Sequence, residues 1–106
     1  MAFNVNSHTQ DGTTVLALVG DLDATTAGEF QDNLDSAVHP GLRRLVLDMR
    51  DLGYLSSAGL RQLIYARQNL ADEVRVVLVG TNERVRRTIE LVGFDQSVTF
   101  VDRMPE

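Results

Sequence analysis

Aspartates and serines that follow apolar segments are the residues of this sequence best suited to chemistry. Carboxylates can ligate Mg²⁺ or act as nucleophiles, and a serine hydroxyl can accept a phosphoryl group. Cysteine is absent, every basic residue apart from His8 and His39 is an arginine, and both histidines have polar or turn-forming neighbours. Thiol chemistry, lysine chemistry and a histidine-rich metal site are therefore excluded, whereas a carboxylate site for Mg²⁺ stays open. The candidates are Asp21, Asp23, Asp48, Asp51, Ser56 and Ser57.

Two local patterns fit aspartate-based phosphotransfer. The segment 21–25, DLDAT, is similar to the DxDxT start of haloacid dehalogenase-like phosphatases, and Asp48, after the apolar 45–47, resembles the phosphoacceptor of response-regulator receivers. The phosphatases also use a downstream basic residue and usually a longer chain, and the receivers use a lysine near the last strand. The missing lysine and the strand positions weigh against both. We interpret Asp48 instead as a strand-end residue that accepts hydrogen bonds from nearby backbone N–H groups.

The segment 52–61, LGYLSSAGLR, is more informative. Two serines stand at the start of an amphipathic helix, and Ala58 and Gly59 are small enough to let another chain approach closely. Neither histidine is placed to act as a general base for a serine nucleophile. Ser57 is therefore predicted to be a phosphoryl acceptor or a helix cap, and not a catalyst.

Alternating and continuous apolar runs predict the strands that position these residues. Asp11-Gly12 supplies a tight turn between the first two strands, and Gly20 ends the second. The nearly unbroken apolar run 74–79 is typical of a central strand covered on both faces. We expect strands from Phe3 to about Ser7, Thr14 to Val19, Leu42 to Asp48, Val74 to Val79 and Val98 to Val101.

Apolar residues at steps of three and four predict three helices. Thr26 and Glu29 fit a capping box for the first, which stops at Pro40-Gly41. The second begins near Ser57, and the third is capped by Thr81 or Asn82 and followed by Gly93 as a left-handed C′ residue. The apolar faces are Ala27, Phe30, Leu34, Ala37 and Val38; Leu60, Leu63, Ile64, Leu70 and Ala71; and Val85, Ile89 and Val92.

This element order predicts an α/β fold, a mixed and mostly parallel sheet of about five strands with an N-terminal hairpin and three or four helices. We expect the 106 residues to form one domain, 1–106, because a 43% hydrophobic content suffices for one modest core. In such sheets, connections after parallel strands meet at one edge. The segments 20–26, 48–57 and 80–82 should therefore lie together.

Charge and hydropathy limit the partners. The formal net charge of −5 argues against direct binding to nucleic acid or to an anionic membrane. The one dense basic cluster, Arg84, Arg86 and Arg87, is interpreted as a solvated helix face. No apolar run is long enough to span a bilayer, and no secretory signal is recognisable, so we expect a cytoplasmic protein.

Several segments together resemble the STAS domains of bacterial anti-sigma factor antagonists. Residues 20–23, GDLD, are similar to the Gly-Glu/Asp-Leu-Asp segment of that family, and 47–52 to its apolar strand ending in Asp-Leu. Residues 54–60, YLSSAGL, resemble the signature around the phosphorylated serine, and 77–80 with 91–94 resemble the closing half. The resemblance covers nearly the whole chain.

This resemblance implies a non-enzymatic partner switch without a cofactor. Alignment on Gly59-Leu60 places Ser57 at the phosphoacceptor, with Ser56, the less favoured acceptor, where many members have aspartate. The unphosphorylated protein would bind an anti-sigma factor with serine kinase activity and so release a sigma factor. Phosphorylation of Ser57 would end the binding, and a serine phosphatase would restore it.

The expected partner contacts are Asp23, Ser56, Ser57, Ala58 and Arg61, with Tyr65 at the rim and Leu60, Leu63 and Ile64 in the core. The sequence ends soon after the last strand, so the usual final helix of the family would be absent or very short. The alternative function is a phosphorylation-independent STAS binding or sensor module of a transporter or stress-signalling complex.

Overall fold

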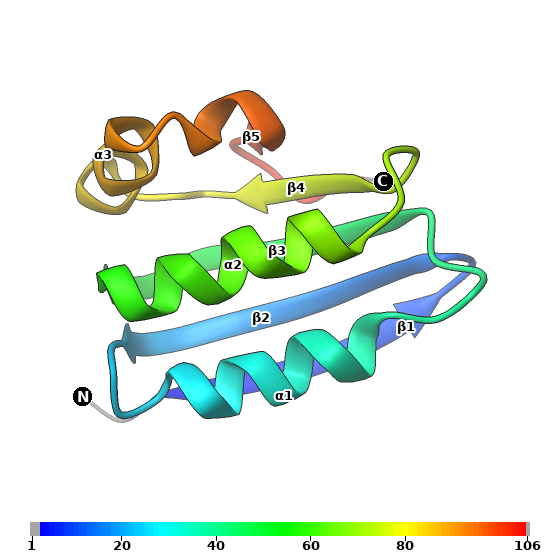
Figure 1. Cartoon of the computed structure of the whole chain (residues 1–106), viewed down its shortest axis with the longest axis horizontal. Helices are drawn as coiled ribbons and strands as arrows, with labels where there is room; N and C mark the ends of the chain where they lie inside the picture. The colour runs from blue at the N-terminus through cyan, green and yellow to red at the C-terminus, as the bar shows by residue number, and fades with distance from the viewer. Residues whose placement is uncertain (1–2, 106) are drawn as a thin grey trace.

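A five-stranded sheet whose strand order follows the chain order organises the protein (Figure 1). The computed structural model describes residues 3–105. β1 is antiparallel to β2, and all other neighbouring strands are parallel, which confirms the predicted α/β fold with its N-terminal hairpin. The elements are β1 (Asn4–Gln10), β2 (Thr13–Leu22), α1 (Ala27–Ala37), β3 (Arg44–Leu55), α2 (Ser57–Asn69), β4 (Arg75–Val79), α3 (Glu83–Leu91), a 3₁₀ helix η1 (Phe94–Ser97) and β5 (Thr99–Val101).

The hairpin has the predicted turn. Asp11 and Gly12 both have positive φ, 51° and 79°, as a two-residue type I′ turn requires. Along β2, buried and half-buried residues alternate without a break from Thr13 to Leu22. The prediction that Gly20 ends this strand is therefore wrong: Gly20 has a φ of 98° inside the strand, beside an irregularity in the pairing with β3.

β3 is much longer than predicted. Its pairing with β4 ends at Asp48, opposite Val79, but its pairing with β2 continues to Leu55. Two register shifts each insert one extra β3 residue, first between Asp48 and Asp51 and then between Leu52 and Tyr54. As a result the core-facing residues of this half, Met49, Leu52 and Leu55, are three positions apart and all buried. The prediction that the strand ends at Asp48 is wrong.

The main core lies between the sheet and the helices. α1 and α2 run in front of the sheet in Figure 1, and α3 and η1 complete the same layer beside β4. On the opposite face β3 and β4 contribute a smaller cluster, Val46, Val77 and Val79, against which Met104 of the C-terminal tail packs. β4 is thus buried on both faces as predicted, but the central strand is β3. The largest fully buried side chains are Phe30, Leu16, Leu18, Leu22, Leu45, Leu47, Met49, Leu52, Leu63, Leu78, Ile89 and Val46.

Three predicted details of the first two helices are wrong. Thr26 occupies the N-cap of α1 without a side-chain cap, because its Oγ1 accepts from the backbone N of Asp23 at 2.9 Å, so the capping box is not formed. Val38 is 48% exposed because α1 ends at Ala37. Ala71 is also exposed, beyond the end of α2 at Asn69.

The ends of α3 follow the expected chemistry. Of the two candidates, Asn82 is the cap, since its Oδ1 accepts from the backbone N of Val85 at 2.8 Å. Val92 is 58% exposed, so it does not belong to the buried face of this helix. Gly93 has a φ of 77° and is the predicted left-handed residue. Within the described residues no helix follows β5, and 102–105 form an irregular tail. None of the helices in residues 3–105 has the length and hydropathy to cross a membrane.

Candidate functional site

Three connections meet where the parallel strands end, as the sequence predicts. The backbone N of Ser56, at the start of α2, donates to the carbonyl oxygen of Leu22, the last residue of β2, at 2.8 Å. Asn82 Nδ2, in front of α3, donates to the carbonyl oxygen of Leu52 in β3 at 2.9 Å. These two bonds fix the starts of α2 and α3 to neighbouring strands. We call the edge formed by these three connections, which lie between β2 and α1, between β3 and α2, and between β4 and α3, the rim. β2 and β3 extend further toward the rim than the sequence predicts.

The two serines have different roles in the helix start. Ser56 is the N-cap of α2: its Oγ accepts from the backbone N of Gly59 at 3.2 Å, and the side chain is half-buried. Ser57 is the first helical residue and is exposed. Its hydroxyl has no hydrogen-bond partner within residues 3–105. The Ser56 hydroxyl is thus used to cap α2, whereas the Ser57 hydroxyl faces solvent.

Gly59 serves the packing of α2 on its own sheet. A Cβ at this buried position would lie 2.6 Å from Leu22 Cγ and 3.0 Å from Leu55 Cδ1. The expectation that Gly59 allows another chain to approach is therefore wrong, because the space beside it is filled by β2 and β3. Ala58 is half-buried, so part of its surface faces solvent beside Ser57.

Asp23 is held by the loop between β2 and α1. Its Oδ1 accepts from the backbone N and the hydroxyl of Thr25, at 2.9 and 2.6 Å. The Thr25 hydroxyl, followed by the Thr25 amide, holds the pKa of this carboxyl below its ordinary value despite a small opposing effect of desolvation. Within residues 3–105 no three acidic or histidine side chains are grouped as a set of metal ligands.

Asp48 and Arg50 form an ion pair that the sequence did not predict. Arg50 Nε and Nη2 donate to the two carboxylate oxygens of Asp48 at 2.9 and 2.8 Å, and the Arg50 backbone N adds a contact of 3.2 Å. The guanidinium hydrogen bond lowers the pKa of Asp48, and Asp48 raises the pKa of Arg50. The Arg50 stem lies against Gly80, where a Cβ would be 2.3 Å from Arg50 Cγ. Asp48 thus accepts the expected hydrogen bond from a backbone N–H, that of Arg50, but the Arg50 guanidinium is its main partner.

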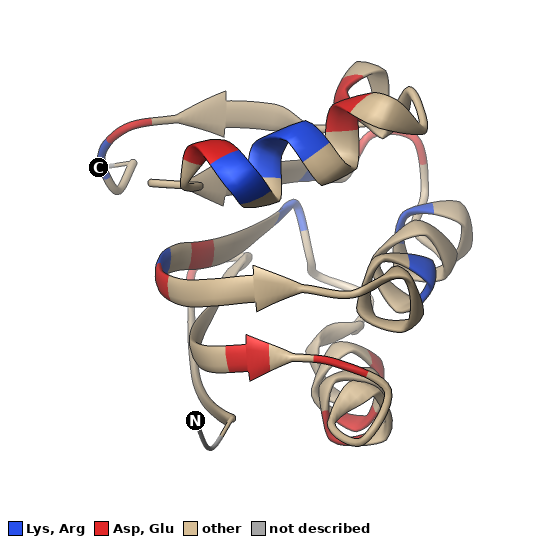
Figure 2. Ribbon diagram, turned by 90° about the vertical axis from the view of Figure 1, so that its left-hand side faces the viewer, with Lys and Arg blue, Asp and Glu red and all other residues tan. Residues whose placement is uncertain are grey.

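The outer face of α2 carries an unpaired cation. Arg61, one turn after Ser57, is exposed and forms no ion pair or side-chain hydrogen bond with any described residue. Tyr65, a further turn along, is 51% exposed, and Leu60 and Leu63 are buried as predicted, with Ile64 half-buried against the core. Figure 2 shows acidic residues at the end of β2 and in α1, below the basic residues of α2. The rim therefore presents Ser57 between an acidic side and Arg61.

Comparison with known proteins identifies the fold family. Residues 4–106 match the family model of the STAS domain. The chain belongs to the STAS domain family. This STAS domain is 36% identical over 85 residues to BtrV of Bordetella bronchiseptica, named as a candidate anti-sigma factor antagonist, and the match covers 79% of the chain and 73% of BtrV.

Further relatives agree with this assignment. The anti-sigma-F factor antagonist RsfB of Mycobacterium tuberculosis is 28% identical over 87 residues, which are 82% of this STAS domain and 71% of RsfB. The crystal structure of an anti-sigma factor antagonist from Mycobacterium paratuberculosis superposes with a TM-score of 0.87 at 24% identity, over 97% of this chain and 88% of that one. At this sequence identity, the structural similarity shows that the two proteins share the same fold.

Proposed function

We propose that this STAS domain is an anti-sigma factor antagonist controlled by phosphorylation of Ser57. In its unphosphorylated form it binds an anti-sigma factor with serine kinase activity, which frees a sigma factor. Phosphorylation ends the interaction, and a serine phosphatase restores it. The observation that carries the proposal is the exposed hydroxyl of Ser57, which has no hydrogen-bond partner within residues 3–105, beside Ser56, whose own hydroxyl caps the helix.

The position of Ser57 favours phosphorylation without unfolding of α2. The first N–H groups of a helix lack partners within the helix and attract anions. Ser56 satisfies the N–H of Gly59 and leaves those of Ser57 and Ala58 for the phosphate. Ser56 also keeps its bonds to β2 and α2, so the cap survives the modification. We therefore expect the fold to be the same in both states.

Phosphorylation changes the charge of the rim in two ways. A phosphoserine adds roughly 1.5–2 negative charges at neutral pH, on the side of the rim where Asp23 follows Leu22, whose carbonyl oxygen accepts from the backbone N of Ser56. It also stands one helical turn before Arg61, at the i, i+4 spacing at which opposite charges attract. The phosphate would draw the guanidinium toward itself and away from an acidic partner. Added repulsion and loss of the Arg61 contact both weaken binding.

Phosphosite mapping tests the proposal directly. The protein is incubated with ATP, Mg²⁺ and lysate of its source cells, and the phosphate is located by mass spectrometry. An acid-stable phosphate is expected on Ser57, lost in Ser57→Ala and retained in the matched control Ser56→Ala. A phosphate on Ser56, an acid-labile phosphate on an aspartate, or no phosphate would each contradict it.

Calorimetry with the anti-sigma factor of the source organism tests the switch. Ser57→Ala is expected to bind as the unmodified protein does, and Ser57→Glu to bind at least tenfold more weakly. Arg61→Ala is expected to weaken binding without changing the melting temperature, because Arg61 is exposed and forms no ion pair or side-chain hydrogen bond with any described residue. Equal affinity of Ser57→Ala and Ser57→Glu would show that charge at this position does not control docking.

A further inference from the structure

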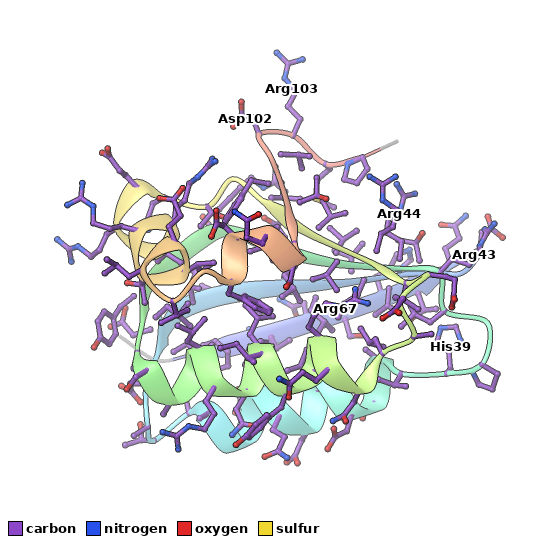
Figure 3. The ribbon with its side chains drawn as sticks, turned by 45° about the horizontal axis from the view of Figure 1, so that its top comes forward. His39, Arg43, Arg44, Arg67, Asp102 and Arg103 are labelled. Carbon is purple, nitrogen blue, oxygen red and sulfur yellow. The ribbon has the colours of Figure 1, made fainter. Side chains whose placement is uncertain are left out.

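A second polar region lies at the opposite end of the sheet from Ser57, where the parallel strands begin. Two hollows adjoin there and share the lining residues Thr13, Arg43 and Arg44. The larger, of about 410 Å³, also includes His8, Gln10, Asp11, Val15 and Pro105. The smaller, of about 250 Å³, is closed by Arg75 and is therefore lined by three arginines and one threonine. Figure 3 shows Arg43 and Arg44 together at this end.

The sheet register forces two of these arginines together. Gln10 pairs with Thr13, Thr13 with Arg44, and Arg44 with Arg75, so these four residues form one row across β1 to β4. Paired residues of neighbouring strands point to the same face. Arg44 and Arg75 are thus like charges directly opposite each other, which is an unfavourable arrangement in a sheet. An anion between them would relieve the repulsion.

No carboxylate within residues 3–105 forms an ion pair with Arg44 or Arg75. Arg50 and Arg86 form ion pairs with Asp48 and Glu90, whereas none of the three arginines of the smaller hollow does so within residues 3–105. Arg43 Nη2 donates to the backbone oxygen of Asp11 at 2.6 Å, which fixes Arg43 beside the turn. Arg44 uses Nε for a 3.4 Å contact with Thr13 Oγ1. Its two terminal nitrogens have no hydrogen-bond partner within residues 3–105 and are available to a ligand.

The geometry points to a binding site for a small phosphate-bearing molecule. Its phosphate would lie in the smaller hollow, bridging Arg44 and Arg75 with Arg43 alongside, since guanidinium groups bind phosphate in a bidentate manner. The rest of the molecule would occupy the larger hollow, whose volume lies within the usual range for small ligands. His8 and Gln10 offer hydrogen bonds there, and Val15 and Pro105 an apolar wall. This site is separate from Ser57 and independent of the proposed switch.

An NMR titration of the intact protein with inorganic pyrophosphate, at physiological ionic strength, tests this inference. Saturable shifts are expected at the amides of Thr13, Arg43, Arg44 and Arg75. Arg44→Gln and Arg75→Gln should each weaken binding about ten- to hundredfold, as expected for loss of a charged hydrogen bond. Each removes one of two repelling charges, so both variants should melt no lower than the parent. Asp11→Asn should strengthen binding, because Asp11 is the only carboxylate among the described residues that line the two hollows.

Arg84→Gln and Arg87→Gln are the matched controls. These arginines line a hollow of about 310 Å³ on α3 that also contains Glu83. Their variants should bind pyrophosphate as the parent does. The site is refuted if millimolar pyrophosphate produces no saturable shifts, if the shifts gather around Ser57, or if the control variants lose as much affinity. Tighter binding of a hexaglutamate peptide than of pyrophosphate would instead assign the arginines to an acidic protein segment.

Discussion

Two glycines in first helical turns, Gly28 in α1 and Gly59 in α2, provide a matched test of how tightly α2 packs on the sheet. A Cβ at exposed Gly28 would meet no described atom within 4 Å beyond its chain neighbours and its own helix backbone, whereas one at Gly59 would lie 2.6 Å from Leu22 Cγ. Replacing a helical glycine with alanine stabilises a protein by about 0.5–1 kcal/mol. Overpacking a core costs about 1–3 kcal/mol. Gly28→Ala should therefore raise the free energy of unfolding by about 0.5–1 kcal/mol, and Gly59→Ala should lower it by about 1–2 kcal/mol.

Urea unfolding of the two variants and the parent protein measures both effects. For a domain near this size, about 1 kcal/mol corresponds to a shift of about 4–8 °C in melting temperature, so the variants should also separate in a thermal scan. A Gly59→Ala protein as stable as its parent would refute the close approach of α2 to Leu22. Equal destabilisation by both variants would mean that glycine is needed at the helix starts for a reason other than packing.

The remaining predictions concern the cap and the ion pair. Ser56→Ala should lower the free energy of unfolding by about 1 kcal/mol in a urea titration, because it removes the α2 cap, whereas Ser57→Ala should leave it unchanged. The pKa of Asp48 lies below its ordinary value of 3.8, so its pairing with Arg50 stabilises the protein above that pH and is lost as the pH falls through the lowered pKa. The stability difference between the parent and Asp48→Asn should therefore shrink from neutral pH to about pH 3.

The element order and most of the core could be predicted from periodicity, but the second half of β3 could not. Buried and half-buried residues alternate strictly along the whole of β2. The sequence therefore predicted this strand correctly, except that the strand continues past Gly20 to Leu22. In β3 the two extra residues change the spacing of the buried side chains from two to three. Met49, Leu52 and Leu55 then follow neither the strand nor the helix period, and a sequence pattern cannot reveal pairing irregularities that depend on the partner strand.

The candidate site was predictable in place and only partly in detail. The predicted strand ends and helix starts were enough to place the site at this edge of the sheet. Which of Ser56 and Ser57 caps α2 could be decided only from the position of the Gly59 backbone N, which donates to Ser56 Oγ. Asn82 was one of two expected caps, with Thr81, but its second bond, to Leu52, joins residues 30 positions apart and leaves no local signal. The row of Arg44 and Arg75 likewise became visible only with the register of β3 and β4.

The order of the strands in the sheet bears on how the protein can be made. Because each strand neighbours the strand synthesised just before it, no strand has to insert between two that are already paired. Chains are synthesised from the N-terminus at about 5–20 residues per second, which is slow compared with hairpin formation. The β1–β2 hairpin can therefore form first on the ribosome and act as a template to which β3, β4 and β5 add in turn. Each addition extends one growing edge, so assembly can proceed in step with translation.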